Sequence, residues 1–138
     1  MEMPPPEYEP LLSQPNHAII SVPRGEGRPP HTTPVWYIYG DGRFYVSMTK
    51  QTVKYRLMQE RPEISLTIDS EGPTVVAEGT AVFRDDDDFL LRTAKEINGL
   101  YRPSLELPPD EELLAQRKAE DRTVLMLEPS RVKAWGLS

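Results

Sequence analysis

A segment in the first half of the chain, YVSMTKQTVKYR (residues 45–56), combines hydroxyl and cationic side chains. The pattern predicts the end of a strand followed by the start of a helix, whose first amides have no partners within the helix. A phosphate at this point would meet free N–H groups, the positive end of the helix dipole and charged donors. The segment therefore predicts an anion site, although a hydroxyl N-cap on a helix with a solvated basic face explains the same pattern.

An aromatic stretch, HTTPVWYIYG (residues 31–40), precedes this segment. In an antiparallel sheet it would lie beside the basic segment, where its rings and small hydroxyls could form a wall for a flat ring system. Pro34 has no N–H group, so one position of this strand cannot pair internally. For Trp36 or Tyr37 taken singly, core and cross-strand packing is the alternative interpretation.

A third aromatic feature is Trp135, in RVKAWG (residues 131–136). A tryptophan in a C-terminal tail is useful where the tail is docked, which can occur on its own barrel or against another subunit. Docking on the same barrel for stability is the simpler interpretation.

The sequence carries no motif for metal binding or for hydrolysis. His17 and His31 are the only histidines, with no paired-histidine helix motif and no serine in a nucleophile elbow. The acidic run 85–88 lacks the alternating ligands, glycine and glutamate of a calcium loop, which favours a helix cap. PRGEGRP (residues 23–29) lacks the lysine–hydroxyl ending of a phosphate loop and predicts a hairpin turn.

Composition limits the function classes. The 138 residues fit one domain, and the absence of cysteine excludes disulfides, thiolate chemistry and cysteine-bound zinc. A net charge of -6 disfavours a nucleic-acid partner, while a small phosphorylated ligand is compatible with a local basic cluster. No apolar stretch approaches the roughly 20 residues of a membrane span, and the start does not resemble a signal peptide, so we expect a cytoplasmic location.

The element pattern predicts a mainly β fold with short helices. Prolines 4, 5, 6 and 10 predict a flexible N-terminal arm over residues 1–10, and a single domain over residues 11–138. The expected elements, in order, are a hairpin from 17–23, a second hairpin around Gly40-Asp41-Gly42, a helix over 51–61, strands over 63–69 and 73–85, a helix from the acidic run to a C-cap at Gly99, a helix within 108–122, and two extended segments around Pro129-Ser130. This order disfavours a doubly wound parallel sheet and favours a small antiparallel barrel.

Taken together, HAIISV, GRPPHTTPVWYIYGDGRFYVSMTKQTVKYRLMQERPEISLTID and VVAEGTAVFRD resemble the split-barrel flavin and deazaflavin proteins related to pyridoxamine 5'-phosphate oxidase. The chain most resembles the coenzyme F420-dependent branch of this family. The resemblance covers residues 11–102 and RTVLMLEPSRVKAWG at the end, which leaves the arm and an insertion over 103–121 unmatched.

The resemblance implies a homodimer of an antiparallel split β-barrel, with the cofactor in a cleft formed by both subunits. It places the cofactor phosphate at Ser47, Met48, Thr49, Lys50, Thr52 and Lys54, with Arg56 nearby. It places the ring along Thr32, Thr33, Pro34, Val35 and Trp36, and it implies that Tyr101, Arg102 and Trp135 reach toward the site of the partner subunit. Where a substrate needs a proton, water or a tyrosine such as Tyr37 or Tyr101 is the expected donor.

The leading hypothesis is a coenzyme F420-dependent reductase of a small conjugated organic substrate, because the cofactor carries the difficult chemistry and no triad or metal cluster is needed. No arginine-rich flavin phosphate pattern precedes HTTPV, which disfavours the vitamin pathway of the oxidases proper. An FMN-dependent oxidoreductase of the same fold is the alternative. A non-catalytic protein that sequesters the cofactor or haem is the hypothesis from another class.

Overall fold

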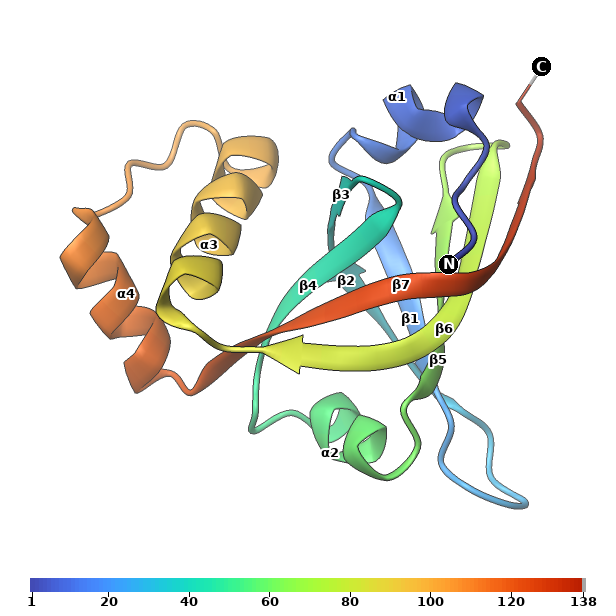
Figure 1. The fold of residues 1–138 in the computed structure, drawn as a ribbon, viewed down its shortest axis with the longest axis horizontal. Coiled ribbons are helices and arrows are strands. Elements are labelled where there is room, and N and C mark those ends of the chain that lie inside the picture. The colour runs from blue at the N-terminus through green and yellow to red at the C-terminus, as the bar shows by residue number, and fades with distance from the viewer. Residues whose placement is uncertain (138) are drawn as a thin grey trace.

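The computed structural model describes residues 1–137, and its centre is one antiparallel sheet of seven strands that curls on itself (Figure 1). The strands are β1 (His17–Val22), β2 (His31–Trp36), β3 (Ile38–Gly40), β4 (Arg43–Thr49), β5 (Glu63–Asp69), β6 (Thr74–Arg84) and β7 (Arg122–Trp135). The helices are α1 (Glu9–Leu12), α2 (Val53–Glu60), α3 (Asp87–Tyr101) and α4 (Asp110–Ala119), after a 3-10 helix at Pro6–Tyr8. The predicted mainly β, antiparallel split barrel is confirmed.

The strand order is β2-β1-β5-β6-β7-β4-β3. β2 and β3 follow each other in the chain with only Tyr37 between them, yet they occupy opposite edges of the sheet. The sheet must therefore curl until its edges approach, and β2 comes close to β4 while no ladder joins these two strands within residues 1–137. Of the aromatic stretch 31–40, only Ile38–Gly40 pairs with β4, whereas His31–Trp36 pairs with β1.

The hairpin turns follow from local chemistry. β3 and β4 are joined by Asp41-Gly42, with φ of 53° and 79°, and Gly40 pairs with Arg43. Positive φ at both central residues is the turn that matches the twist of two antiparallel strands, which is why Asp-Gly occurs there. The predicted hairpins are confirmed.

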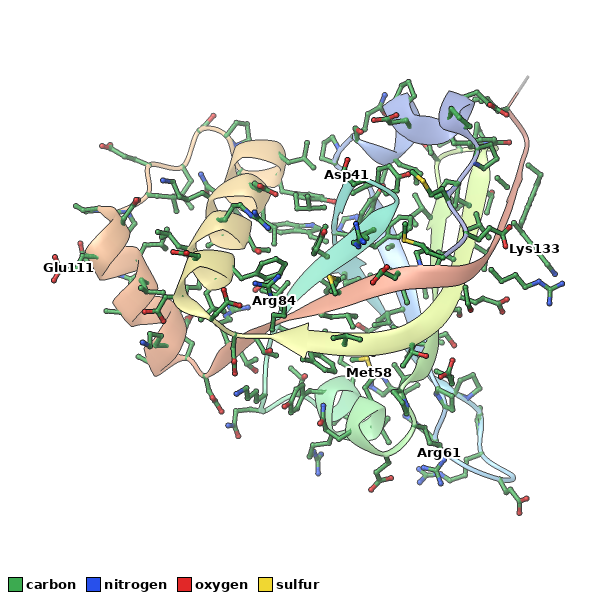
Figure 2. All side chains as sticks on the ribbon, in the orientation of Figure 1. Asp41, Met58, Arg61, Arg84, Glu111 and Lys133 are labelled. Atoms are coloured by element: carbon green, nitrogen blue, oxygen red, sulfur yellow. The ribbon has the colours of Figure 1, made fainter. Side chains whose placement is uncertain are left out.

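Alternation along the strands fills the barrel. Inward positions carry apolar side chains that are buried: Ala18, Ile20, Val22, Phe44, Val46, Met48, Leu66, Ile68, Val75, Ala77, Leu125 and Leu127. α2 covers one end of the barrel, where Met58 is 1% exposed and points from the helix toward the strands (Figures 1 and 2). Each such fully buried aliphatic side chain contributes roughly 1.5–3 kcal/mol to folding, so the core carries most of the stability.

The N-terminal residues differ from the expectation of a flexible arm. They form the 3-10 helix and α1, with Tyr8 6% exposed and Leu12 fully buried in the barrel core. The Glu2 amide donates to the Pro129 carbonyl at 2.8 Å. The prolines do not prevent these helices because proline is well tolerated in the first turn of a helix, where its missing N–H has no partner to lose.

Two further boundaries differ. α3 continues through Gly99 to Tyr101, and it ends before Pro103 because proline disfavours helix in the preceding residue. The two extended segments predicted around Pro129-Ser130 are one strand, β7, whose register against β6 shifts between Glu78 and Gly79. A bulge of this kind accommodates a proline within a strand.

Candidate functional site

A cleft of about 430 Å³ lies outside the barrel, where β2, the end of β4, the start of α2, α3 and α4 meet. Its lining is Pro34, Val35, Trp36, Ser47, Met48, Thr49, Thr52, Lys54, Ala94, Ile97, Asn98, Arg102, Leu105, Leu107, Arg117 and Arg122. The lining contains four cations and no acid, within a protein of net charge -6. Such a set of charges favours an anionic ligand.

The junction of β4 and α2 supplies hydroxyl groups. Thr52 is the N-cap of α2: its Oγ1 accepts from the Tyr55 amide at 3.4 Å and donates to the Thr49 carbonyl at 3.0 Å. Ser47 and Thr49, two positions apart on β4, lie on the same face of the strand and both line the cleft. The predicted strand-to-helix junction is therefore present, and its N-cap occupies part of the cleft wall.

Lys54 extends from the first turn of α2 into this wall. Its side chain is half-buried, and burial lowers the pKa of its ammonium group. It makes no ion pair with any residue of the described chain. A desolvated ammonium without a carboxylate gains more from a bound anion than an exposed lysine does.

Trp36 forms a flat wall held in place by its neighbours. Its ring stacks on Tyr101 with centroids 4.8 Å apart and planes 13° apart, and the Arg102 guanidinium lies 4.9 Å from its centroid. The indole N–H donates to His17 Nε2 at 3.2 Å. These contacts restrain the indole at the wall of the cleft.

Tyr101 is held through its hydroxyl group. The hydroxyl accepts from the Tyr37 amide at 3.1 Å and lies 2.8 Å from the carbonyl oxygens of Asn16 and Tyr37, to which it can donate its single proton. The end of α3 is thereby tied to the link between β2 and β3. This places the neighbouring Arg102 at the cleft.

The 103–121 segment, unmatched in the family resemblance, contributes three lining residues, and the first residue of β7 adds a fourth. Leu105 and Leu107 precede α4, Arg117 lies on α4, and Arg122 begins β7. Burial and the neighbouring Arg122 lower the pKa of Arg117. Arg122 contacts Glu120 at 3.3 Å.

The structure brings nine of the predicted cofactor residues together at this cleft: Pro34, Val35, Trp36, Ser47, Met48, Thr49, Thr52, Lys54 and Arg102. The other six do not line it: Thr32, Thr33, Lys50, Arg56, Tyr101 and Trp135. Lys50 pairs instead with Asp85 at 2.6 Å, and Arg56 is exposed. Trp135 pairs with Thr74 at the end of β7 and is 52% exposed.

The two tyrosines proposed as proton donors have other positions. Tyr37 is fully buried in the barrel core, where its hydroxyl accepts from Asn16 Nδ2 at 3.2 Å and burial raises its pKa to about 12. Tyr101 contacts Trp36 but uses its hydroxyl for backbone groups. Neither residue lines the cleft.

Sequence analysis missed seven lining residues: Ala94, Ile97, Asn98, Leu105, Leu107, Arg117 and Arg122. One available signal was the position of Arg117, four residues after Leu113 and three after Leu114, on the apolar face of α4. A cation on the buried face of an amphipathic helix indicates a site beneath that helix. The contribution of α3 has no comparable signal, because its stripe equally fits core packing.

Three comparisons place this fold among known proteins. A conserved hypothetical protein of Mycobacterium tuberculosis, Rv2991, superposes with a TM-score of 0.82 at 17% identity, over 99% of this chain and 86% of that one. An F420 reductase superposes with a TM-score of 0.70 at 20% identity, over 94% and 98%. An FAD-binding protein of Mesorhizobium loti superposes with a TM-score of 0.65 at 17% identity, over 93% and 91%. A comparison with the curated proteins found no significant match.

The curled antiparallel sheet with a cleft between β2 and the β4–α2 junction defines a split-barrel protein. The family model for pyridoxamine 5'-phosphate oxidase matches residues 4–136, and the chain belongs to this family. Over residues 1–137, no helix is long and apolar enough to cross a membrane.

Proposed function

We propose that this protein is a coenzyme F420-dependent oxidoreductase that reduces a small, conjugated organic substrate. The observation that carries the proposal is the acid-free cleft at the β4–α2 junction, with the half-buried Lys54 beside hydroxyl groups and the flat Trp36 wall. Membership of a family of oxidoreductase folds supports the reaction class, and the F420 reductase among the structural neighbours supports the cofactor.

The residues of the cleft fit a phosphorylated ring cofactor. Lys54, the hydroxyls of Ser47 and Thr49, and the first amides of α2 would bind the phosphate. Trp36 and the edge of β2 would orient the ring. When bound, the deazaflavin supplies the hydride chemistry, and the chain contributes binding, orientation and exclusion of water.

Water exclusion is the task of the apolar residues around the cleft. Ile97 of α3 and the two leucines 105 and 107 line the cleft and supply apolar surface there. Because the hydroxyls of Tyr37 and Tyr101 are engaged elsewhere, we propose that a proton needed by the substrate comes from solvent. The activity should then show no pH step from a cleft tyrosine.

FMN is the second candidate cofactor. The same hydroxyls and Lys54 suit a terminal phosphate, and an FAD-binding protein is among the structural neighbours. FMN would share the ring wall at Trp36 with the deazaflavin. The two cofactors are therefore separated by their relative affinities and not by a single residue.

We also propose a homodimer with the site at the subunit interface. Ile19 pairs with Pro34 on one side and with Thr67 on the other, and Thr67 in turn pairs with Val76. These four residues form an uncharged row across β2, β1, β5 and β6. Ile19 is 42% exposed, so this row is open in the single chain. A second copy covering the row would reach Pro34 and hence the edge of the cleft. Sedimentation should give the mass of two chains, and a monomer at micromolar concentration would refute this.

The test begins with fluorescence titrations of the purified protein with coenzyme F420 and, separately, with FMN. Micromolar or tighter binding of the deazaflavin with weaker binding of FMN supports the proposal, and the reverse order supports the second candidate. Reduced cofactor should then be oxidised by a conjugated acceptor at a rate that rises with protein concentration. Binding without turnover over a broad panel of acceptors would indicate a carrier of the cofactor, and no binding would remove the proposal.

A further inference from the structure

The register of β4 against β7 brings Arg122 to the proposed phosphate site. Arg122 pairs with Thr49, and Val124 pairs with Ser47. Residues paired across two antiparallel strands project from the same face of the sheet. The Arg122 side chain therefore projects beside the hydroxyls of Ser47 and Thr49, and all three line the cleft.

Arg117 approaches the same place from α4. It lines the cleft together with Arg122, whose charge is close enough to lower the pKa of Arg117. Glu120 offsets part of the charge of Arg122, at 3.3 Å, while Arg117 has no ion pair among residues 1–137. Two neighbouring guanidiniums in a cleft without a carboxylate in its lining match an anion with several acceptor oxygens, which arginine binds in a bidentate manner.

α4 itself is weakly attached. It buries Leu113 and places Leu114 against the Phe89–Leu90 cluster. Its charged contacts to α3 are Lys118 with Asp87 at 3.0 Å and Lys95 with Asp110 at 3.1 Å, all between exposed side chains. Exposed pairs contribute little, so an added bond from Arg117 to a ligand would be a substantial share of what holds α4 in place.

We infer that Arg117 and Arg122 complete the phosphate site from α4 and β7, and that cofactor binding fixes α4 over the cleft. This inference rests on the proposed function. It assigns the 103–121 segment to phosphate recognition: α4 is a cover whose Arg117 engages the ligand only when the phosphate is present. Riboflavin and 8-hydroxy-5-deazariboflavin carry the rings without phosphate, so their binding should leave α4 no better ordered than in the free protein.

The first test compares ligands that differ in the phosphate. The affinity ratio of FMN to riboflavin, and of coenzyme F420 to 8-hydroxy-5-deazariboflavin, is measured for the wild type, Arg117→Gln and Arg122→Gln. Loss of a charged hydrogen bond should reduce the ratio at least about tenfold in each variant, while the phosphate-free ligands keep their affinity within about twofold. Arg92→Gln removes an exposed arginine of α3 outside the cleft and should leave the ratio unchanged.

Arg117→Lys keeps the charge and guards against a folding defect. Its affinity ratio of phosphorylated to phosphate-free ligand should lie between those of the wild type and Arg117→Gln, since an ammonium cannot form two parallel bonds to a phosphate. Circular dichroism verifies that each variant is folded.

An unchanged ratio in folded Arg117→Gln overturns the inference while the proposed function stands. If that variant instead raises only the KM of an anionic substrate, the arginine binds substrate and the inference is wrong. Wild-type protein that binds neither cofactor removes both proposals.

The second test is hydrogen exchange of the full-length protein. Amides of residues 110–119 should exchange more slowly with FMN or coenzyme F420 bound than with the corresponding phosphate-free ring compound. In Arg117→Gln this added protection should be lost, although the cleft is still saturated with cofactor. Equal protection by the phosphate-free compounds would show that ring contacts alone hold α4, and would overturn the inference.

Discussion

Replacing Lys54 by alanine tests the phosphate site most directly. The ammonium is half-buried and has no ion pair in the described chain, so a bound phosphate would be its principal partner. A charged hydrogen bond contributes about 1.5–3 kcal/mol, which corresponds to a roughly 10- to 150-fold weaker Kd for the cofactor. The hydroxyls and the α2 amides remain in the variant, so binding should be weakened and not abolished.

The same substitution should not destabilise the free protein. Burial lowers the pKa of Lys54, so its folded pKa lies below the unfolded value and the folded state disfavours the proton that the side chain carries at pH 7. For a group with this sign, stability rises as the pH rises through the folded pKa toward the unfolded value. Removal of the ammonium should therefore leave the thermal midpoint at pH 7 unchanged or slightly higher, which melting followed by circular dichroism measures.

Arg56→Ala is the matched control, because it removes one cation from an exposed position of the same helix outside the cleft. Fluorescence titration should give a Kd within about twofold of the wild type for this variant. A Kd of Lys54→Ala that equals the wild-type value in folded protein would refute the phosphate assignment. Equal losses in both variants would show that the net charge of α2, and not a contact, governs binding.

Three further predictions concern the scaffold. Tyr101→Phe removes the hydroxyl that accepts from the Tyr37 amide and contacts the carbonyls of Asn16 and Tyr37. Denaturant titration should show a free energy of unfolding lower by about 1–3 kcal/mol, and an unchanged value would mean that water replaces the hydroxyl. Deletion of residues 1–8 removes the buried Tyr8 and should lower the thermal midpoint measurably; an unaltered midpoint would restore the interpretation of a loose arm. Burial raises the pKa of Tyr37 to about 12, above its unfolded value. The neutral phenol therefore contributes about 2–3 kcal/mol to the free energy of unfolding below pH 10, and this contribution is lost as the pH rises to 12. Tyr37→Phe should flatten this part of the pH dependence of unfolding, and an identical alkaline profile would contradict the assignment.

The strands and the main turns could be predicted because their signals are local. Alternation along β4 and the Asp41-Gly42 turn depend on residues only a few positions apart, and the Thr52 cap lies directly before the helix that it starts. The N-terminal prolines failed as a signal because proline is also a good first-turn residue, and the deciding factor was the distant barrel end that buries Leu12.

The site was predictable in part for the same reason. Ser47, Thr49 and Lys54 are close in sequence and stay close in space. Lys50 and Arg56 belong to the same run, but the turn and the helix direct them to Asp85 and to solvent, and sequence spacing alone does not give those directions. The spacing of Arg117 on α4 indicates that it lies on the buried face of that helix, but only the packing of α4 places it at the cleft. Arg122 reaches the cleft through the pairing of β7 with β4, which no local pattern contains.

The two open edges of the sheet have a consequence for self-association in the unliganded protein. An unpaired edge strand offers free N–H and C=O groups to any other strand, and this is a common start of aggregation. Here one edge, β2, carries Pro34, which has no N–H to offer, and the other, β3, is only three residues long. The curl of the sheet also brings β2 close to β4. The two edge strands, β2 and β3, are thus poor templates for the addition of another strand. The barrel can therefore stay open for a ligand without a raised tendency to form fibrous assemblies.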